Sequence, residues 1–235
     1  MKFPPILLII AIAFVILPTS VTKTAEPAKP ILVDVQRIWD KAPHNAFTDL
    51  IRHKDLWYCV FREGSGHVSP DGSLRVITSV DGKQWASKAL ISSATHDLRD
   101  AKITVTPQGK LLLNGAGMIA DAEIRYQSMS WLSSNDGATW DNGHIIGHPG
   151  FWLWRVQWHD NLAYTFGYST ERDRTTRRLR LYTSQTGSQF DTHVQQLTAP
   201  AGCGEDTILF LKDGTALCLL RHETGTKMAQ LGRSV

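Results

Sequence analysis

Apolar residues recur along this chain in short runs, each preceded by a polar turn of Asp, Asn or Gly. A turn of this kind running into an apolar strand is the pattern of a β-hairpin. Four segments share it, with corresponding turn positions at Asp55, Gly109, Asn161 and Gly214, and the steps between them are 54, 52 and 53 residues. A unit of about 50 residues that contains several short strands has the size of a propeller blade. The pattern therefore predicts an all-β repeat protein.

A second motif falls between these turns. Two segments share S-x-D-G-x-x-W, and residues 184–190 form a weaker copy with Thr for Asp and Phe for Trp. Asp and Gly suit a tight turn between strands, because the carboxylate can accept backbone N–H bonds. We expect antiparallel four-stranded units with this motif in the turn between the outer two strands. The motif residues are Ser79, Asp81, Gly82, Trp85, Ser134, Asp136, Gly137 and Trp140.

This motif, at this spacing, resembles the Asp-box, or BNR repeat, of the sialidase (neuraminidase) superfamily. The resemblance runs from about Val33 to the C-terminus and implies a six-bladed β-propeller. Six blades of about 53 residues need well over 300 residues, on the order of 100 more than this chain offers. We therefore expect residues 26–235 to form a sialidase-like propeller domain that is truncated at the C-terminus, with about three and a half blades. A complete four-bladed ring with a short last blade is the alternative.

The first 25 residues have a different pattern. A short positive start is followed by twelve apolar residues, Ile6 to Leu17, and then by Pro18. The run is shorter than the roughly 20 residues that cross a bilayer, and this combination is typical of a secretory signal peptide. We expect residues 1–25 to be a signal peptide and the protein to be secreted or periplasmic, with no stable membrane insertion. An N-terminal membrane anchor is the alternative.

Composition narrows the classes of function. Hydrophobic residues make up 42% of the chain and charged residues 20%, so there is ample apolar surface to form a core. The net charge of +3 is spread without a run of like charges and gives no nucleic-acid footprint. The three cysteines suit no zinc site and no disulfide framework, and Cys59 and Cys218 lie in apolar runs. We expect no metal and no cofactor.

Charged residues at corresponding positions of the repeats predict a functional site at the central channel of the propeller. Counting nine residues back from the turn gives Asp100 and Glu205, and counting seven forward gives Arg62 and Arg221. Glu205 and Arg221 are sixteen residues apart and match the activating Glu and a carboxylate-binding Arg of sialidases. The resemblance thus implies a secreted, exo-α-sialidase-like glycoside hydrolase acting on terminal sugars of glycans. A structural ion pair is the alternative for Glu205 and Arg221.

The sequence also departs from the sialidase pattern. Asn-Ala-Phe-Thr-Asp at residues 45–49 stands where sialidases have Arg-Ile-Pro, so the first Arg of the carboxylate-binding triad is missing. The Asp acid/base has no clear counterpart, and the third Arg and the Tyr nucleophile would lie in later blades. The sugar therefore need not be sialic acid, and we expect this chain alone to be inactive. A non-catalytic glycan-binding propeller, or an inactive truncated homologue, is the alternative function.

The candidate site residues follow from these counts and from the polar segments beside them. Trp faces stack on sugar rings, while carboxylates and Arg hold hydroxyls or an anionic group. The candidate catalytic residues are Glu205, Arg221 and Asp100, and the candidate substrate-binding residues are Arg62, Glu63, Arg99, Trp154, Arg155 and Glu223.

Two further segments near the predicted site carry clustered aromatic or basic residues. For the Trp-rich run 151–158, packing between blades is the alternative to sugar binding. Strand alternation places Trp152, Trp154 and Trp158 on one face of this run. The Arg-rich segment 172–178 is expected to be a solvated hairpin loop.

Overall fold

The computed structural model describes residues 29–119, 122–197, 202–225 and 227–234. The chain divides into two compact units, Met1–Val35 and Gln36–Val235. Residues 29–35 of the first unit contain no helix or strand. The predicted signal peptide, residues 1–25, lies outside the described residues. No helix in the described ranges is long and apolar enough to span a membrane.

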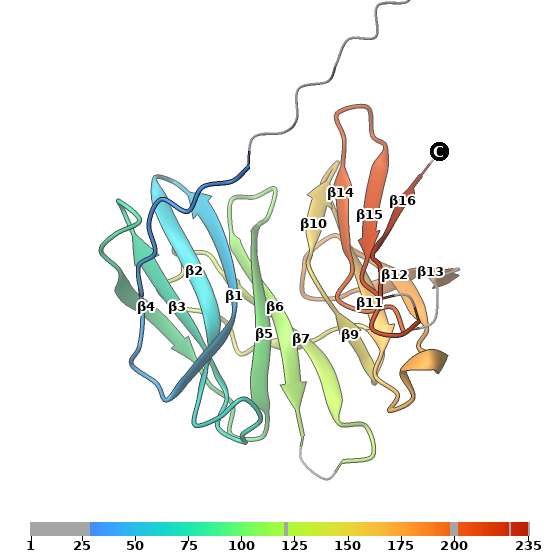
Figure 1. Ribbon diagram of the computed structural model, residues 1–235, viewed down its shortest axis with the longest axis horizontal. Coiled ribbons are helices and arrows are strands. Elements are labelled where there is room, and N and C mark those ends of the chain that lie inside the picture. The colour runs from blue at the N-terminus through green and yellow to red at the C-terminus, as the bar shows by residue number, and fades with distance from the viewer. Residues whose placement is uncertain (1–28, 120–121, 198–201, 226, 235) are drawn as a thin grey trace, which may run out of the picture. The chain divides into compact units, whose positions relative to one another are not determined.

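The strands of the second unit pair antiparallel in four sheets, called blades 1 to 4 here (Figure 1). Blade 1 contains β1 (His44–His53), β2 (Leu56–Gly64), β3 (Ser73–Ser79) and β4 (Ala86–Ile91). Blade 2 contains β5 (Asp97–Val105), β6 (Leu111–Met118), β7 (Tyr126–Ser133) and β8 (His144–Ile145). Blade 3 contains β9 (Phe151–Leu153), β10 (Gln157–His159), β11 (Leu162–Ser169), β12 (Leu179–Ser184) and β13 (Asp191–Leu197), with one helical turn, η1 (Arg174–Thr176). Blade 4 contains β14 (Thr207–Phe210), β15 (Ala216–Leu220) and β16 (Gln230–Arg233).

The predicted repeat of hairpin turns is confirmed. The four turn positions join the first two strands of blades 1 to 4 in order. All four have left-handed backbone, with φ of 63° at Asp55 and Asn161, 75° at Gly109 and 83° at Gly214. Asp, Asn and Gly are the residues that adopt this conformation most readily. The same local turn chemistry therefore marks the corresponding position in each of the four blades.

The first S-x-D-G-x-x-W motif forms the turn between β3 and β4, the outer two strands of blade 1. One carboxylate oxygen of Asp81 accepts the Ser79 hydroxyl at 3.0 Å and the backbone N–H groups of residues 83 and 84 at 2.8 and 2.9 Å. These backbone bonds, the one from residue 84 first, lower the pKa of Asp81. The Trp85 ring N–H donates to the carbonyl of Gly82 at 3.0 Å, which holds the aromatic side chain on the turn.

The second motif lies between β7 and β8, but its predicted hydrogen-bonding residues are wrong. The hydroxyl of Ser133, not Ser134, and the side-chain carbonyl of Asn135, not Asp136, occupy the roles of the first motif. This turn is one residue longer, and the extra residue is Asp136 at φ 55°. Its carboxylate receives the Lys54 ammonium at 2.8 Å instead. An amide oxygen accepts backbone N–H bonds as a carboxylate does, so the turn keeps its form.

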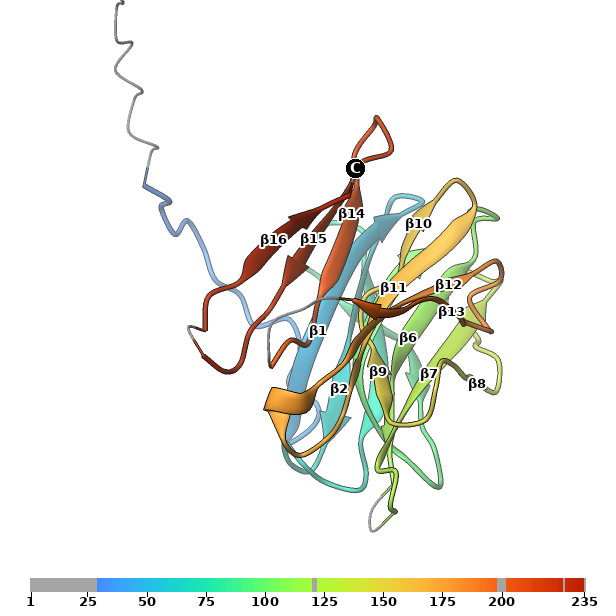
Figure 2. The same cartoon turned by 90° about the vertical axis from the view of Figure 1, so that its right-hand side faces the viewer.

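Neighbouring blades pack face to face in a propeller arrangement. The first strand of each later blade lies against the preceding blade: β5 on β1 to β3, β9 on β6 and β7, and β14 on β10 and β11 (Figures 1 and 2). Between blades 1 and 2 the core includes Tyr58, Val60, Leu74, Ile103 and Trp131, all less than 4% exposed. Each large apolar side chain buried in this way contributes about 1.5–3 kcal/mol.

The later blades depart from the regular four-stranded unit. Residues 154–156 interrupt the first strand of blade 3, and the described part of blade 4 has three strands. The break defeats the predicted alternation, because Trp152 and Trp154 pack in a buried cluster with residues of blades 2 and 4, while Trp158 packs with Leu153 in a separate cluster. The described chain thus forms four blades, and the fourth has three strands. The six blades and the C-terminal truncation expected from the resemblance stay predictions.

Candidate functional site

Three blades share a strained position at or just before their first strand. Phe47, Asp100 and Glu205 all have left-handed backbone, with φ of 64°, 55° and 59°. The pairing of β1 with β2 and of β5 with β6 shifts register at this position, which marks a bulge. All three side chains line one cavity. The bulge therefore repeats at one end of the propeller and directs side chains into a common space.

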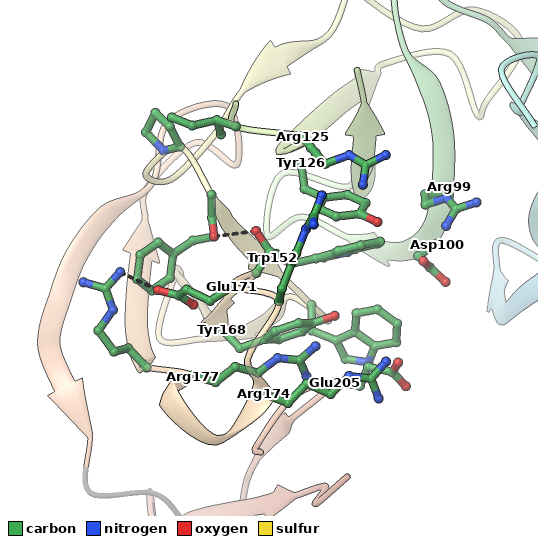
Figure 3. Close-up of a pocket in the computed structure, with 18 of the residues that line it drawn as sticks. Arg99, Asp100, Arg125, Tyr126, Trp152, Tyr168, Glu171, Arg174, Arg177 and Glu205 are labelled. Carbon is green, nitrogen blue, oxygen red and sulfur yellow. Dashed lines mark hydrogen bonds and ion pairs between the residues drawn. The ribbon is translucent and has the colours of Figure 1, made fainter. Parts of the chain in front are cut away.

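The cavity has a volume of about 940 Å³, which is within the usual range for small-molecule sites. The start of β5, residues 122–126, the start of blade 3 and the loop after β11 contribute its walls, together with Glu205 and Glu223. Arg99 and Asp100 lie across it from Trp152 and Tyr168 (Figure 3). Four segments far apart in the sequence thus converge on one space.

Aromatic rings form one wall of the cavity. Trp152 and Tyr168 are stacked, with ring centroids 6.2 Å apart and planes 11° apart. Tyr126 lies 5.0 Å from Trp152 on the other side, and Trp154 lies 6.5 Å away. The ring N–H of Trp152 is buried and has no hydrogen-bond partner within the described ranges. The Trp-rich run therefore both packs between blades 3 and 4 and lines the cavity.

Asp100 and Lys102 are the buried ionisable groups of the cavity wall. Asp100 is 9% exposed, and burial is the main cause that raises its pKa; the Glu205 carboxylate adds to this, while Lys102 and Arg99 oppose it. Lys102 is 7% exposed, and burial lowers the pKa of its ammonium against the opposing effect of Asp100 and Asp49. Its nitrogen lies 4.4 Å from the centroid of the Trp154 ring.

Ion pairs link the opposite side of the cavity. Glu205 and Arg221, which the sequence analysis paired, are 2.6 Å apart. Arg221 also reaches Glu223 at 3.0 Å, and Glu223 in turn pairs with Arg174 at 2.7 Å and Arg177 at 3.1 Å. Glu205 and Glu223 line the cavity, whereas Arg221 lies behind them. The structure brings the predicted pair together, and the guanidinium is engaged by two carboxylates.

The prediction that Arg62 binds substrate is wrong. Its side chain is completely buried, and its three nitrogens donate to Asp97, to the carbonyl of Gly66 and to Ser69 at 2.7–3.0 Å. The connection between β2 and β3 folds over it, and a Cβ on Gly72 would lie 1.9 Å from Asp97 and 2.5 Å from Arg62. Because the nitrogens of Arg62 already donate to protein groups, its guanidinium has a structural role.

Glu63 and Arg155 also lie outside the cavity wall. Glu63 accepts the ring N–H of Trp39 and pairs with Arg75 at 2.9 Å. Arg155 pairs with the carboxylate of Asp49, a residue of β1. Both candidates therefore hold structure within or between blades.

Arg99, Trp154 and the loop before β12 do line the cavity. Arg99 pairs with Asp97 at 3.2 Å and donates to the carbonyl of His67 at 2.8 Å, which fixes its side chain. Residues 172–178 form the predicted hairpin loop, between β11 and β12, and most of them are exposed; Arg172, Arg174, Arg177 and Arg178 also border the cavity. The folding of this loop over the cavity could not be seen in its charge pattern.

Sequence reasoning missed several cavity residues. Tyr168 stood at the counted position of blade 3 but received no role, and Lys102 follows Asp100 by two residues on the same strand. A search for polar residues at i and i+2 of each first strand would have found Lys102. Tyr126 and Arg177 had no such signal, since both come from segments outside the counted strands.

A metal site and a reactive thiol place different requirements on the described residues. Within the described ranges, no group of three or more His, Cys, Asp or Glu is placed to hold a metal ion. The three cysteines are free thiols. Burial raises the pKa of Cys59 and of Cys203 to about 11, so these thiols are poor nucleophiles at neutral pH.

The fold and this cavity define a class, a β-propeller of four blades with an aromatic and charged cavity at one end. No protein-family model matches the sequence, and no curated protein matches it. Solved structures do resemble it. A Dyadobacter fermentans protein of unknown function has a TM-score of 0.70 at 17% identity, over 84% of this chain and 68% of that one.

Two glycoside hydrolases are also similar in structure. A Penicillium chrysogenum α-L-arabinanase has a TM-score of 0.64 at 14% identity, and a Hadza microbial sialidase has 0.67 at 12%. Each match covers 82% of this chain, but the chain spans only 63% of the arabinanase and 45% of the sialidase. At this identity the likeness shows the shared β-propeller fold. Membership of the sialidase superfamily stays a prediction.

Proposed function

We propose that the cavity binds the terminal sugars of a glycan and that the chain carries the substrate-binding face of a glycoside hydrolase. The observation that carries this proposal is the stacked wall of Trp152 and Tyr168 facing the carboxyl group of Asp100 across the cavity. Aromatic side chains commonly line sites for small ligands, and carboxyl groups act as the acid and base of most glycosidases. The arabinanase and sialidase among the similar structures agree with this class of substrate.

In this proposal Asp100 and Glu205 divide the chemistry. The raised pKa of Asp100 favours its protonated form, which suits a general acid that donates to the leaving oxygen. Glu205, paired with Arg221, acts as the base or nucleophile on the other side of the bond. Both side chains come from equivalent bulges and line the same cavity.

The test is hydrolysis of a panel of alkyl glycosides of arabinofuranose, xylose, galactose and sialic acid, whose poor leaving group requires a general acid. Asp100→Asn and Glu205→Gln should each lower turnover by about 100-fold or more while leaving binding within a few-fold, as expected for general acid–base groups. Glu171→Gln is the matched control, because Glu171 lines the cavity but pairs with Arg178. Unchanged turnover in both active-site variants would contradict the assignment.

A non-catalytic glycan-binding module is the second candidate. It is favoured by the 2.6 Å contact of Glu205 with Arg221, which engages a carboxylate that the hydrolase would need free. Binding of a glycan on an array with no turnover of the panel, and loss of that binding in Trp154→Ala, would support this candidate over the hydrolase. Export from the cytoplasm, expected from the pattern of residues 1–25, is part of the proposal for either candidate.

A further inference from the structure

Most cationic groups of the cavity wall are already paired with carboxylates. Arg99 pairs with Asp97, Arg174 and Arg177 pair with Glu223, and Arg178 pairs with Glu171; Arg125 and Arg172 are exposed at the surface. Four of these guanidinium groups are therefore already engaged by carboxylates, although the Nε–H groups of Arg99 and Arg177 have no partner within the described residues.

Lys102 differs from all of them. Its side chain borders the cavity and is 93% buried, since it is 7% exposed. Within the described ranges its ammonium has no hydrogen bond and no carboxylate within 4.0 Å, and it lies over the face of Trp154. A buried ammonium without hydrogen-bond acceptors is costly unless a ligand or water supplies them. The side chain is thus held in position by the ring and aimed at the cavity.

The charges nearest the Lys102 ammonium do not favour an anion at that point, although the described lining of the whole cavity carries seven Lys or Arg and five Asp or Glu side chains. The groups that act on it are Asp100, Asp49, Glu205 and Arg155. Together with Lys102 they carry a formal charge of −1 when Asp100 is ionised and of zero when it is protonated. A sugar carboxylate placed at the ammonium would also face Asp100 and Glu205, and like charges in a site of low dielectric repel strongly. Hydroxyl oxygens accept from the ammonium without this repulsion.

We propose that Lys102 is a specificity-determining residue that donates hydrogen bonds to hydroxyl groups of an uncharged sugar, so that the site selects neutral over carboxylated glycans. This inference rests on the proposed function, because it names the class of sugar for the same cavity. Trp154 fixes the ammonium from one side, so the ligand approaches its remaining N–H groups from the cavity. A site built to bond a hydroxyl discriminates strongly against ligands that leave the donor unpaired.

The experiment compares matched ligands in the full chain. The probes are methyl glycosides of L-arabinofuranose, D-xylose, D-galactose and D-glucose, with the uronic acids of the two hexoses, and binding is measured by calorimetry. The wild-type protein should bind a neutral member of the panel, and each hexoside at least tenfold more tightly than its uronic acid where binding is seen. Lys102→Met should weaken the neutral ligand by at least tenfold. Lys110→Met, which alters an exposed lysine in the turn after β5, is the control and should bind as the wild type does.

A second measurement does not depend on the folding of Lys102→Met. Lysines of the wild-type protein are ¹³C-methylated, and the Lys102 resonance is assigned by its loss in Lys102→Arg. A neutral sugar from the panel should shift this resonance and leave that of Lys110 in place. Binding that is unchanged in Lys102→Met, with no shift in the wild type, would overturn the inference alone. A preference for the uronic acids would overturn the selection of neutral sugars, and the absence of any sugar binding would overturn the proposed function itself.

Discussion

Arg62 in blade 1 and Arg221 in blade 4 occupy the same position of the repeat, seven residues after the first hairpin turn, yet their environments are opposite. Arg62 is completely buried beneath the connection between β2 and β3. Arg221 is 47% exposed in its side chain and pairs with Glu205 and Glu223 beside the cavity. The position in the repeat determines where the Cα atom of the residue lies. The loop that follows the strand determines whether the side chain is buried as a structural group or lies beside the cavity.

The connection over Arg62 depends on close approach. The backbone carbonyls of Gly66 and Ser69 accept from the guanidinium, and the amide of Leu98 donates to the carbonyl of Gly72, which ties blade 2 to the same loop. Blade 4 has no such loop over Arg221 in the described ranges. The contrast teaches that one register position serves stability in one blade and the cavity in another.

The sharpest test of this contrast removes each guanidinium in turn. Arg62→Met leaves the buried carboxylate of Asp97 with Arg99 as its remaining ion-pair partner, and breaking a buried pair costs about 3–5 kcal/mol. Arg221→Met removes a half-exposed pair, which is worth about 0.2–1 kcal/mol. Urea unfolding followed by tryptophan fluorescence measures both. Equal losses in the two variants would contradict the division into structure and site.

Two buried carboxylates extend the comparison. Asp97 is paired with the Arg62 guanidinium, whereas Asp206 is fully buried, pairs with no cation in the described part of the chain, and accepts the amide N–H of Arg221 at 2.8 Å. Burial raises the pKa of Asp206 to about 6 from its usual 3.8. The folded state therefore binds more protons than the unfolded state between about pH 4 and pH 6, and stability falls as pH rises through this range.

Asp206→Asn should remove that fall. At pH 7 the variant should be more stable than the wild type by roughly 1–3 kcal/mol, because the amide has no charge to bury. At pH 4, where Asp206 is protonated in the fold, the two should be nearly equal. Urea midpoints between pH 4 and pH 7 provide the measurement, and a wild-type slope that persists in the variant would assign it to another group.

The smallest expected effects separate the two motif turns. Asn135→Ala should cost about 1 kcal/mol, because the side-chain carbonyl accepts a backbone N–H and a hydroxyl. Asp136→Ala should cost less, since this carboxylate meets an exposed lysine at the turn surface. Thermal unfolding at low and high salt distinguishes them, and only the Asp136 variant should lose its effect in salt. A larger loss of stability in Asp136→Ala than in Asn135→Ala would instead support the role that the sequence motif predicts for Asp136.

The sequence pattern predicted the blades well because their turns depend on local chemistry. Asp55, Gly109 and their counterparts adopt left-handed backbone wherever they occur between two strands. Asp100 and Glu205 were found for the same reason, since counting from those turns reaches the bulge. Lys102, Tyr126 and Arg177 were not identified, because a loop and two neighbouring blades bring them together. Burial of Arg62 likewise depends on a loop whose path no periodicity records.

The repeated bulge has a consequence for how such cavities can be recognised. Phe47, Asp100 and Glu205 hold a conformation that costs a residue with a side chain about 1–2 kcal/mol more than the ordinary right-handed one. Glycine would relieve that penalty at each position, and none of the three is glycine. In an otherwise relaxed sheet, non-glycine residues with positive φ at one register therefore mark the end of the propeller that carries the cavity.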